Sequence, residues 1–215
     1  MAVLTVDVTS EDIHYPLKIE KGLLNHLAEE IKSVYKNKKI AIVTDAHVQA
    51  LYGERVVEQL EAAGYELTVI VLEPGEQSKS LENLQHIFSE LIAFGLSRSD
   101  LMLALGGGVI GDLAGFAAAS YLRGIAFVQI PTTLLAQVDS SVGGKVAIDL
   151  PEGKNLVGAF YHPKLVLIDP NVLETLSDST FNDGMAEVIK YGCIHDHDFF
   201  EQLKQYQSRA EVMAE

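Results

Sequence analysis

The order of hydrophobic and polar positions along this chain predicts alternating helices and strands. Two short apolar runs, residues 3–8 and 15–20, predict strands joined by a turn of Thr9, Ser10, Glu11 and Asp12. Beyond them, stretches with helical periodicity alternate with short apolar runs. The predicted helices are residues 23–34, 47–63, 81–94, 113–120 and 133–138, and the predicted strands are residues 39–44, 66–72, 100–105, 125–130 and 165–168.

This alternation has a direct consequence for the fold. Helices and strands joined by short polar connections predict an α/β fold, in which helices cover both faces of a mostly parallel sheet. Gly64 and Gly95 stand where predicted helices end, as residues that close helices in a left-handed conformation do. Between residues 139 and 160 the chain is rich in glycine, and we assign no helix or strand there.

The character of the chain changes at Asn171. Residues 172–176, 181–194 and 198–213 predict helices, and no further strand pattern follows. We therefore expect an α/β domain over residues 1–170 and the start of an all-helical second domain over residues 171–215. The last helical pattern has no C-cap glycine, so we expect the rest of that domain to lie outside this sequence.

A glycine-rich turn stands between a strand and a helix. Gly106, Gly108 and Gly111 follow the apolar run 101–105 and precede the Ala-rich residues 113–120. Such a turn exposes backbone N–H groups at a helix N-terminus, where the helix dipole favours a phosphate. A turn of this kind also occurs simply to pack a helix against a sheet. The motif alone therefore leaves a nucleotide site and a packing role as alternatives.

The acidic residue that usually accompanies this motif is missing. Common dinucleotide folds hold the adenosine ribose with an Asp or Glu about 20 residues further on. Here no Asp or Glu stands between Asp112 and Asp139. Asp45, at the end of the strand 39–44, is the natural substitute. The pattern thus predicts a nucleotide-binding fold with a different strand order.

Composition limits the classes of partner. The chain has 215 residues, 48% of them hydrophobic, and a formal net charge of −14. This charge argues against nucleic acid and anionic membranes as partners, so an anionic ligand must be held by a few aimed cations. The single cysteine, Cys193, excludes an internal disulfide framework and fits a reducing compartment. With no leader pattern and no membrane-spanning run, we expect a cytoplasmic protein.

Several polar groups are candidates for chemistry. The turn after strand 66–72 contains Pro74, Gly75, Glu76, Gln77, Ser78 and Lys79. This turn lies at the carboxyl edge of the predicted sheet, where ligands bind, but a solvated turn with a serine N-cap explains it equally simply. Thr132 and Thr133 have the same two interpretations, a helix cap or hydroxyl donors to phosphate.

Charged and polar side chains gather in an otherwise apolar stretch. They are Arg123, Asp139, Lys145, Lys154 and Asn155. Buried charges need partners, so a structural salt bridge explains any one of them. Together, around one crevice, they favour a pocket for phosphate or carboxylate.

Glu187 and Lys190 are three residues apart in the predicted helix 181–194, so they share a face. An ordinary ion pair is one interpretation. Their neighbours are mostly apolar or small, which indicates partial burial and makes Glu187 a candidate ligand for a divalent metal. His195 and His197 lack helical spacing to Glu187, and we do not expect them to be ligands.

Taken together, four ordered motifs resemble the 3-dehydroquinate synthase family of the sugar-phosphate cyclase superfamily. The resemblance covers essentially the whole chain. The motifs are GGVIGDLAGF at residues 107–116, QIPTTLLAQVDSSVGGK at 129–145, KNLVG at 154–158 and GMAEVIK at 184–190.

The resemblance implies an enzyme of the shikimate route to aromatic amino acids. Members convert 3-deoxy-D-arabino-heptulosonate 7-phosphate to 3-dehydroquinate and phosphate, with an NAD that is recycled in each turnover and a divalent metal, zinc or cobalt. A homodimer is expected. The alternatives are another sugar-phosphate cyclase, a metal-dependent polyol dehydrogenase and a non-catalytic nucleotide-binding module.

The resemblance also implies roles for individual residues. NAD would contact Asp45, Pro74, Gly75, Glu76, Gln77, Ser78, Lys79, Gly108, Val109, Ile110, Gly111, Asp112, Thr132, Thr133, Lys145, Lys154, Val172, Leu173, Glu174 and Thr175. The sugar phosphate would contact Arg123, Asp139, Lys145, Asn155 and Lys190. Glu187 would be one metal ligand, and the other two are histidines of the later helical domain. We therefore expect this chain alone to be inactive.

Overall fold

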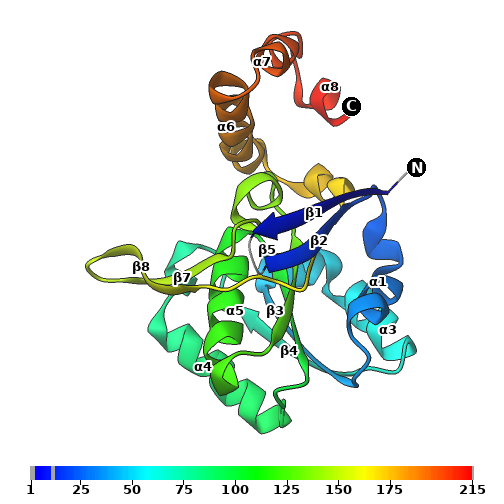
Figure 1. Cartoon of the computed structure of the whole chain (residues 1–215), viewed down its shortest axis with the longest axis vertical. Coiled ribbons are helices and arrows are strands. Elements are labelled where there is room, and N and C mark those ends of the chain that lie inside the picture. The colour runs from blue at the N-terminus through cyan, green and yellow to red at the C-terminus, as the bar shows by residue number, and fades with distance from the viewer. Residues whose placement is uncertain (1–2, 11–12, 215) are drawn as a thin grey trace.

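The computed structural model describes residues 3–10 and 13–214, and its body is built on a seven-stranded sheet (Figure 1). Within this sheet, the first two strands of the chain pair antiparallel and all other neighbouring strands pair parallel, so the sheet is mostly parallel, as the sequence predicts. In spatial order the strands are β1 (Leu4–Ser10), β2 (Ile13–Ile19), β9 (Leu165–Ile168), β6 (Ala126–Pro131), β5 (Leu101–Gly106), β3 (Lys39–Asp45) and β4 (Glu66–Leu72).

Helices cover both faces of this sheet. On one face, Ile40 and Ile42 of β3 pack against α1 (Leu27–Val34) and α3 (Glu54–Ala62). On the other face, Ala41 and Val43 pack against α4 (Leu81–Phe94) and α5 (Gly108–Ser120). Every residue of β5 is buried, because a central parallel strand is covered on both sides. The predicted α/β class is confirmed.

Several helix ends lie where their side chains predict. Ser80 caps α4 by accepting a hydrogen bond from the Asn83 N–H at 3.2 Å, and Gly95 closes the same helix with a φ of +68°. The start of α5 differs from the prediction. The sequence pattern predicts a helix over residues 113–120, but α5 begins at Gly108. The glycine-rich segment is therefore the first turn of the helix itself.

Other boundaries also differ from the sequence-based expectations. The predicted helix 23–34 divides into η1 (Leu23–Asn25) and α1, and the helix 47–63 is α2 (Ala46–Val48), the π-helical η2 (Gln49–Gly53) and α3. Residues 172–176 fall mostly in the 3-10 helix η6 (Pro170–Thr175), and residues 198–213 form two helices instead of one. Glu11 and Asp12, in the predicted first turn, lie outside the described residues.

The helices after η6 project from the body (Figure 1). They are α6 (Asp178–Ile194), α7 (His197–Leu203) and α8 (Arg209–Ala214). Gly184 lets α6 pack closely against the segment that contains Leu134, because a Cβ at Gly184 would lie 2.6 Å from the Cβ of Leu134. No strand follows residue 168 in the described part of the chain, as the helical pattern predicts.

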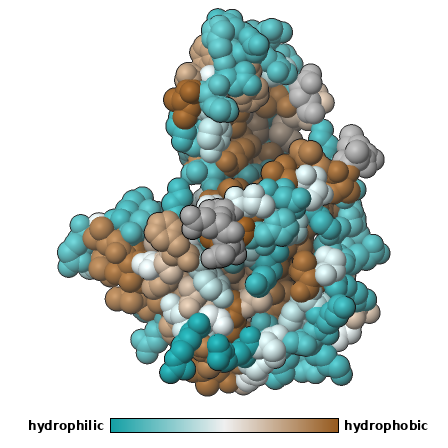
Figure 2. Space-filling view, in the orientation of Figure 1, coloured by the Kyte–Doolittle hydropathy of each residue, from teal (hydrophilic) through white to brown (hydrophobic). Residues whose placement is uncertain are grey.

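The glycine-rich stretch, to which the sequence pattern assigns no helix or strand, contains an antiparallel hairpin of β7 (Lys145–Leu150) and β8 (Gly153–Phe160). It packs against α5 and extends away from the sheet (Figure 1). Periodicity does not reveal these strands, because Gly153 and Gly158 interrupt the apolar alternation. Figure 2 shows hydrophobic surface over this projection, where Phe160 is 82% exposed and Leu156 59% exposed.

We predict that Gly158→Ala destabilises the protein, because a Cβ at Gly158 would lie 2.2 Å from the backbone oxygen of Val146. Overpacking of this kind costs roughly 1–3 kcal/mol in the free energy of unfolding. Urea denaturation measures the change. Gly153→Ala on the same strand is the control, since its nearest neighbour is the flexible Leu156 Cδ1 at 3.3 Å. Equal stability of the two variants would contradict the close approach.

Candidate functional site

A cavity opens at the carboxyl ends of the parallel strands. We call it the glycine cleft; its volume is about 690 Å³. Its lining residues are Asp45, His47, Val48, Leu51, Tyr52, Glu73, Pro74, Gly75, Gly107, Gly108, Val109, Ile110, Thr132, Thr133, Thr175, Leu176, Ser177 and Thr180. Because β3, β5 and β6 are neighbours in the sheet, segments far apart in the sequence meet here.

One wall of the glycine cleft is the N-terminus of α5. Gly107 occupies the N-cap position, and no side chain caps the helix there. The first N–H groups of a helix lack intrahelical acceptors and carry the positive end of the helix dipole. Nearby, the buried hydroxyl of Thr132 has no hydrogen-bond partner among the described residues. Donors without acceptors line this wall, which suits an anion with several oxygen atoms.

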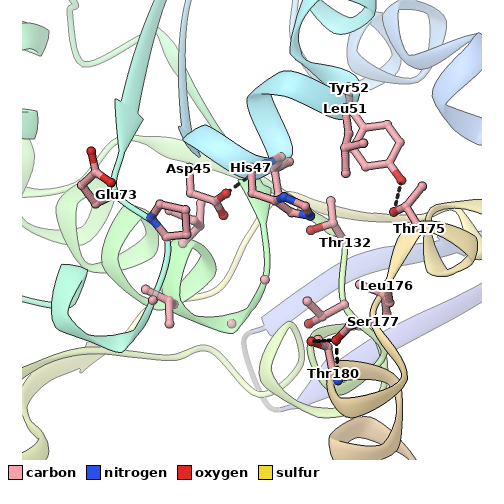
Figure 3. Close-up of a pocket in the computed structure, with 18 residues that line it drawn as sticks. Asp45, His47, Leu51, Tyr52, Glu73, Thr132, Thr175, Leu176, Ser177 and Thr180 are labelled. Atoms are coloured by element: carbon pink, nitrogen blue, oxygen red, sulfur yellow. Dashed lines mark hydrogen bonds between the residues drawn. The ribbon is translucent and has the colours of Figure 1, made fainter.

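The opposite wall comes from β3 and the helical segment after it (Figure 3). Asp45 caps α2, since its Oδ1 accepts from the Val48 N–H at 2.9 Å. The Tyr52 hydroxyl lies 2.7 Å from Thr175 Oγ1, so η2 is tied to η6 across the cleft. The sequence identified Asp45 and Thr175 but missed His47, Tyr52 and Glu73. His47 and Glu73 closely follow the ends of β3 and β4, and this position is the signal that was available; Tyr52 lies further on, in η2, and carries no such signal.

A buried ammonium group joins the elements beside this cleft. Lys79 follows η3 (Glu76–Ser78), and its side chain is 4% exposed. Its Nζ donates to Asp112 Oδ2 at 2.8 Å and to Asn155 Oδ1, and it lies 3.9 Å from Asp149 Oδ1. We call these four residues the Lys79 cluster. The cluster links the turn after β4, the first turns of α5 and the β7–β8 hairpin.

Two opposing effects act on the pKa of Asp112 in the Lys79 cluster. Burial raises the pKa of Asp112 above its ordinary value, and the hydrogen bond and charge of Lys79 oppose this rise. Lys79 thus favours the charged form of the Asp112 carboxylate, against the effect of its burial.

A second cavity, with a volume of about 490 Å³, is lined in part by two residues of the cluster, Asp112 and Asn155. We call it the hairpin cavity. Its lining residues are Asp112, Asp139, Ser140, Lys145, Val146, Ala147, Asn155, Gly158, Ala159 and Phe160. Three of the five residues predicted to contact a sugar phosphate, Asp139, Lys145 and Asn155, therefore meet in one place. Asp112, which bonds to Lys79, lines this cavity, and Gly108, one turn earlier in α5, lines the glycine cleft.

Glu187 and Lys190 form the predicted ion pair on α6. The hydrogen bond that the Lys190 ammonium donates to Glu187 raises the pKa of Lys190, and the charge of Asp139 contributes in the same direction. Tyr191 donates to the Val138 carbonyl at 3.1 Å, so this face of α6 meets η5 (Ala136–Ser140), which contains Asp139. The Glu187 side chain is 15% exposed, in agreement with the partial burial that its neighbours indicate.

Some predicted residues are not brought to either cavity. Arg123 follows the carboxyl end of α5, so the 13-residue helix separates it from the Gly108 turn by about 20 Å. Val172 and Leu173 are buried in the fold, and Glu174 is exposed. Gln77 donates to the Pro74 carbonyl and Ser78 to the Glu73 carbonyl, so both close their own turn. Lys154 is exposed and pairs with Glu76 at 3.1 Å.

Among residues 3–10 and 13–214, no group of three or more His, Cys, Asp or Glu side chains is placed to hold a metal ion. Glu187 therefore stays a single predicted ligand. No helix in the described part of the chain has the length and apolar character needed to cross a bilayer.

We predict that Lys79→Met lowers the free energy of unfolding by roughly 1–3 kcal/mol near neutral pH, because Asp112 loses its partner. Without Lys79, burial raises the pKa of Asp112 without opposition. The penalty is present above this raised pKa and disappears as the pH falls through it toward the ordinary value of 3.8. Urea denaturation at neutral and acidic pH measures both effects. The double variant Lys79→Met with Asp112→Asn removes the unpaired charge and should recover stability; an undiminished loss would contradict the pairing.

The chain is similar in sequence to known proteins. Two relatives named 3-dehydroquinate synthase are 61% identical over 199 residues, from Clostridium beijerinckii, and 58% identical over 213 residues, from Clostridium botulinum. These alignments cover 93% and 99% of this chain but 57% and 60% of the relatives. The chain therefore spans less than two thirds of the length of the relatives it matches.

Solved structures share the same architecture. A 2-epi-5-epi-valiolone synthase from Streptomyces hygroscopicus, with NAD+ and Zn2+ bound, is 32% identical with a TM-score of 0.83 over 92% of this chain and 54% of its own. A 2-deoxy-scyllo-inosose synthase complexed with carbaglucose-6-phosphate, NAD+ and Co2+ is 28% identical, with a TM-score of 0.80 over 87% of this chain and 50% of its own.

A family model described as "3-dehydroquinate synthase N-terminal" matches residues 69–183, which include the Lys79 cluster and the start of α5. Because this match spans more than half of the 215 residues, the chain belongs to the 3-dehydroquinate synthase family.

Proposed function

We propose that this chain is the NAD-binding portion of a 3-dehydroquinate synthase. The whole protein would convert 3-deoxy-D-arabino-heptulosonate 7-phosphate to 3-dehydroquinate and phosphate. The observation that carries the proposal is that the first turns of α5 border both cavities: the uncapped N-terminus of the helix faces one, and Asp112 lines the other with Lys145, Asp139 and Asn155. A cofactor and an anionic substrate can then lie side by side.

The glycine cleft suits NAD. A pyrophosphate would accept from the first N–H groups of α5 and from the unpartnered Thr132 hydroxyl. Asp45 lies at the carboxyl end of β3, next to β5, where it would hold a ribose hydroxyl in place of the missing acid of common dinucleotide folds. NAD, when bound, would accept a hydride from the substrate and return it.

The hairpin cavity suits the sugar phosphate. Lys145 would offer its ammonium to the phosphate or the carboxylate, Asn155 would offer an amide, and the Asp139 carboxylate would accept from a hydroxyl. Lys190 would add a cation from α6, near Asp139. Elimination of phosphate followed by ring closure requires a substrate held in one conformation, and these side chains provide several fixed points for it.

The metal requires residues beyond the described chain. The valiolone synthase and the inosose synthase contain Zn2+ and Co2+, and we propose a divalent metal for this protein, with Glu187 as one ligand. A structural or catalytic metal site needs at least three protein ligands, and the described residues supply no such group. We therefore place the complete site between the two proposed domains, residues 1–170 and the helical domain that begins at residue 171.

The proposed surroundings of the protein follow from the same function. A cytoplasmic biosynthetic enzyme agrees with the single cysteine, and the net charge of −14 agrees with a small-molecule substrate instead of a nucleic acid. We also propose a homodimer, which the exposed apolar residues of the hairpin support. We still propose that Arg123 contacts the substrate. Within this chain, however, it follows the carboxyl end of α5, about 20 Å from the Gly108 turn.

A related cyclase is the second candidate, because the valiolone and inosose synthases share this fold at TM-scores of 0.83 and 0.80. We predict that the full-length protein with NAD and Co2+ releases phosphate from the heptulosonate phosphate and forms 3-dehydroquinate. Sedoheptulose 7-phosphate and glucose 6-phosphate are the comparison substrates. Faster phosphate release from either would favour another cyclase, and NAD binding without any turnover would favour a nucleotide-binding module.

We predict that Gly108→Val in the full-length protein weakens NAD binding at least tenfold, or about 1.4 kcal/mol. A branched side chain would fill the space in front of the first turn of α5. Calorimetric titration with NAD measures the dissociation constant. A Cβ at Gly108 would also lie 3.0 Å from Ser140 Oγ. The control is therefore Gly108→Val with Ser140→Ala, which relieves that contact and should bind NAD as weakly as the single variant. Recovery of affinity would assign the effect to internal crowding.

A further inference from the structure

Asp149 stands at an irregularity in the β7–β8 hairpin. Ile148 pairs with Val157, but Leu150 pairs with Gly153, so the register shifts at Asp149. A bulge of this kind turns a residue out of the ladder and re-aims it. The Asp149 N–H donates to the Lys79 carbonyl at 2.8 Å instead of to the opposite strand. The irregularity thus fastens the hairpin to the turn after β4.

The Asp149 side chain acts on the opposite strand. Its Oδ1 accepts a hydrogen bond from the Asn155 N–H at 2.8 Å, and its side chain is 18% exposed. Asn155 has a φ of +56°, in the left-handed region that residues other than glycine rarely occupy. Asparagine tolerates this region better than most residues, and an acceptor for its N–H helps to hold it there. Asp149 therefore stabilises an unusual backbone conformation at Asn155.

Lys79 fixes the other end of the same residue. Its ammonium donates to Asn155 Oδ1, so the amide oxygen is already occupied. Asn155 also lines the hairpin cavity with Lys145 and Asp139. With the backbone held by Asp149 and the oxygen held by Lys79, the Nδ2 group remains to donate a hydrogen bond to an oxygen atom of a bound molecule.

We propose that Asp149 is a positioning residue for the anionic substrate: it holds Asn155 so that the amide presents a donor to a phosphate or hydroxyl oxygen in the hairpin cavity. This inference rests on the proposed function. Asp149 itself lines neither cavity, so it acts through Asn155 and not by contact with the substrate. Its contribution should therefore disappear when the Asn155 side chain is removed.

The test is a double-mutant cycle in the full-length protein. Asp149→Ala should raise the KM for the heptulosonate phosphate roughly tenfold with a smaller change in kcat, whereas Asp149→Asn, which keeps an acceptor oxygen, should stay close to wild type. In an Asn155→Gly background, where glycine adopts the left-handed conformation freely, Asp149→Ala should leave the KM unchanged. If Asp149→Ala does not fold, Asp149→Ser replaces it in the cycle.

Amide hydrogen exchange provides a readout that does not depend on turnover. The Asn155 N–H should exchange faster in Asp149→Ala than in wild type or Asp149→Asn. An unchanged KM in Asp149→Ala, or an equal rise in both backgrounds, overturns the inference, and the equal rise would indicate only a general structural role. A wild-type protein that does not release phosphate from the heptulosonate phosphate instead overturns the proposed function, whatever the exchange rates are.

Discussion

The arrangement of the hairpin cavity depends on the buried ammonium of Lys79. It bonds to Asp112 in the second turn of α5 and to Asn155 in the hairpin, and it comes from the turn after β4. An ammonium that is 4% exposed is stable only where acceptors surround it, so these segments must meet. Loss of this one charge would therefore loosen the hairpin cavity and leave an uncompensated carboxylate at the start of α5.

Much of the fold is predictable because it follows from periodicity. The strand Glu66–Leu72 and the helix Leu81–Phe94 have the predicted bounds, since continuous apolar runs and a Ser-to-Gly pair of caps define them. The order of strands in the sheet is a different matter. It depends on contacts between residues far apart in the sequence, such as Ile40 with Leu101 and Val128 with Leu165. Hydrophobic pattern predicts the class of sheet but carries no information about which strands are neighbours.

The candidate site shows the same division. Gly108, Asp45 and the Thr132–Thr133 pair are predicted from their positions at strand ends and line the glycine cleft, whereas Gly106 and Gly111 of the same glycine turn do not. The β7–β8 hairpin was not predicted, because its glycines disguise the alternation of apolar residues. Lys79 and Lys154 belong to predicted cofactor-binding sets, yet one is buried in a charge cluster and the other is exposed beside Glu76. Residue type alone does not distinguish these environments.

The position of Asp149 illustrates why a charge cluster can be more than a stabilising contact. A salt bridge between Lys79 and Asp112 alone would satisfy both charges. The additional carboxylate accepts a backbone N–H at 2.8 Å and leaves Lys79 free to hold an amide oxygen. In a chain with a net charge of −14, acidic side chains around a single ammonium also keep it from attracting anions for itself. The exposed cation of the hairpin cavity, Lys145, then remains the favourable partner for the phosphate of the proposed substrate, so the cluster would separate the group that organises the cavity from the group that we propose to contact the ligand.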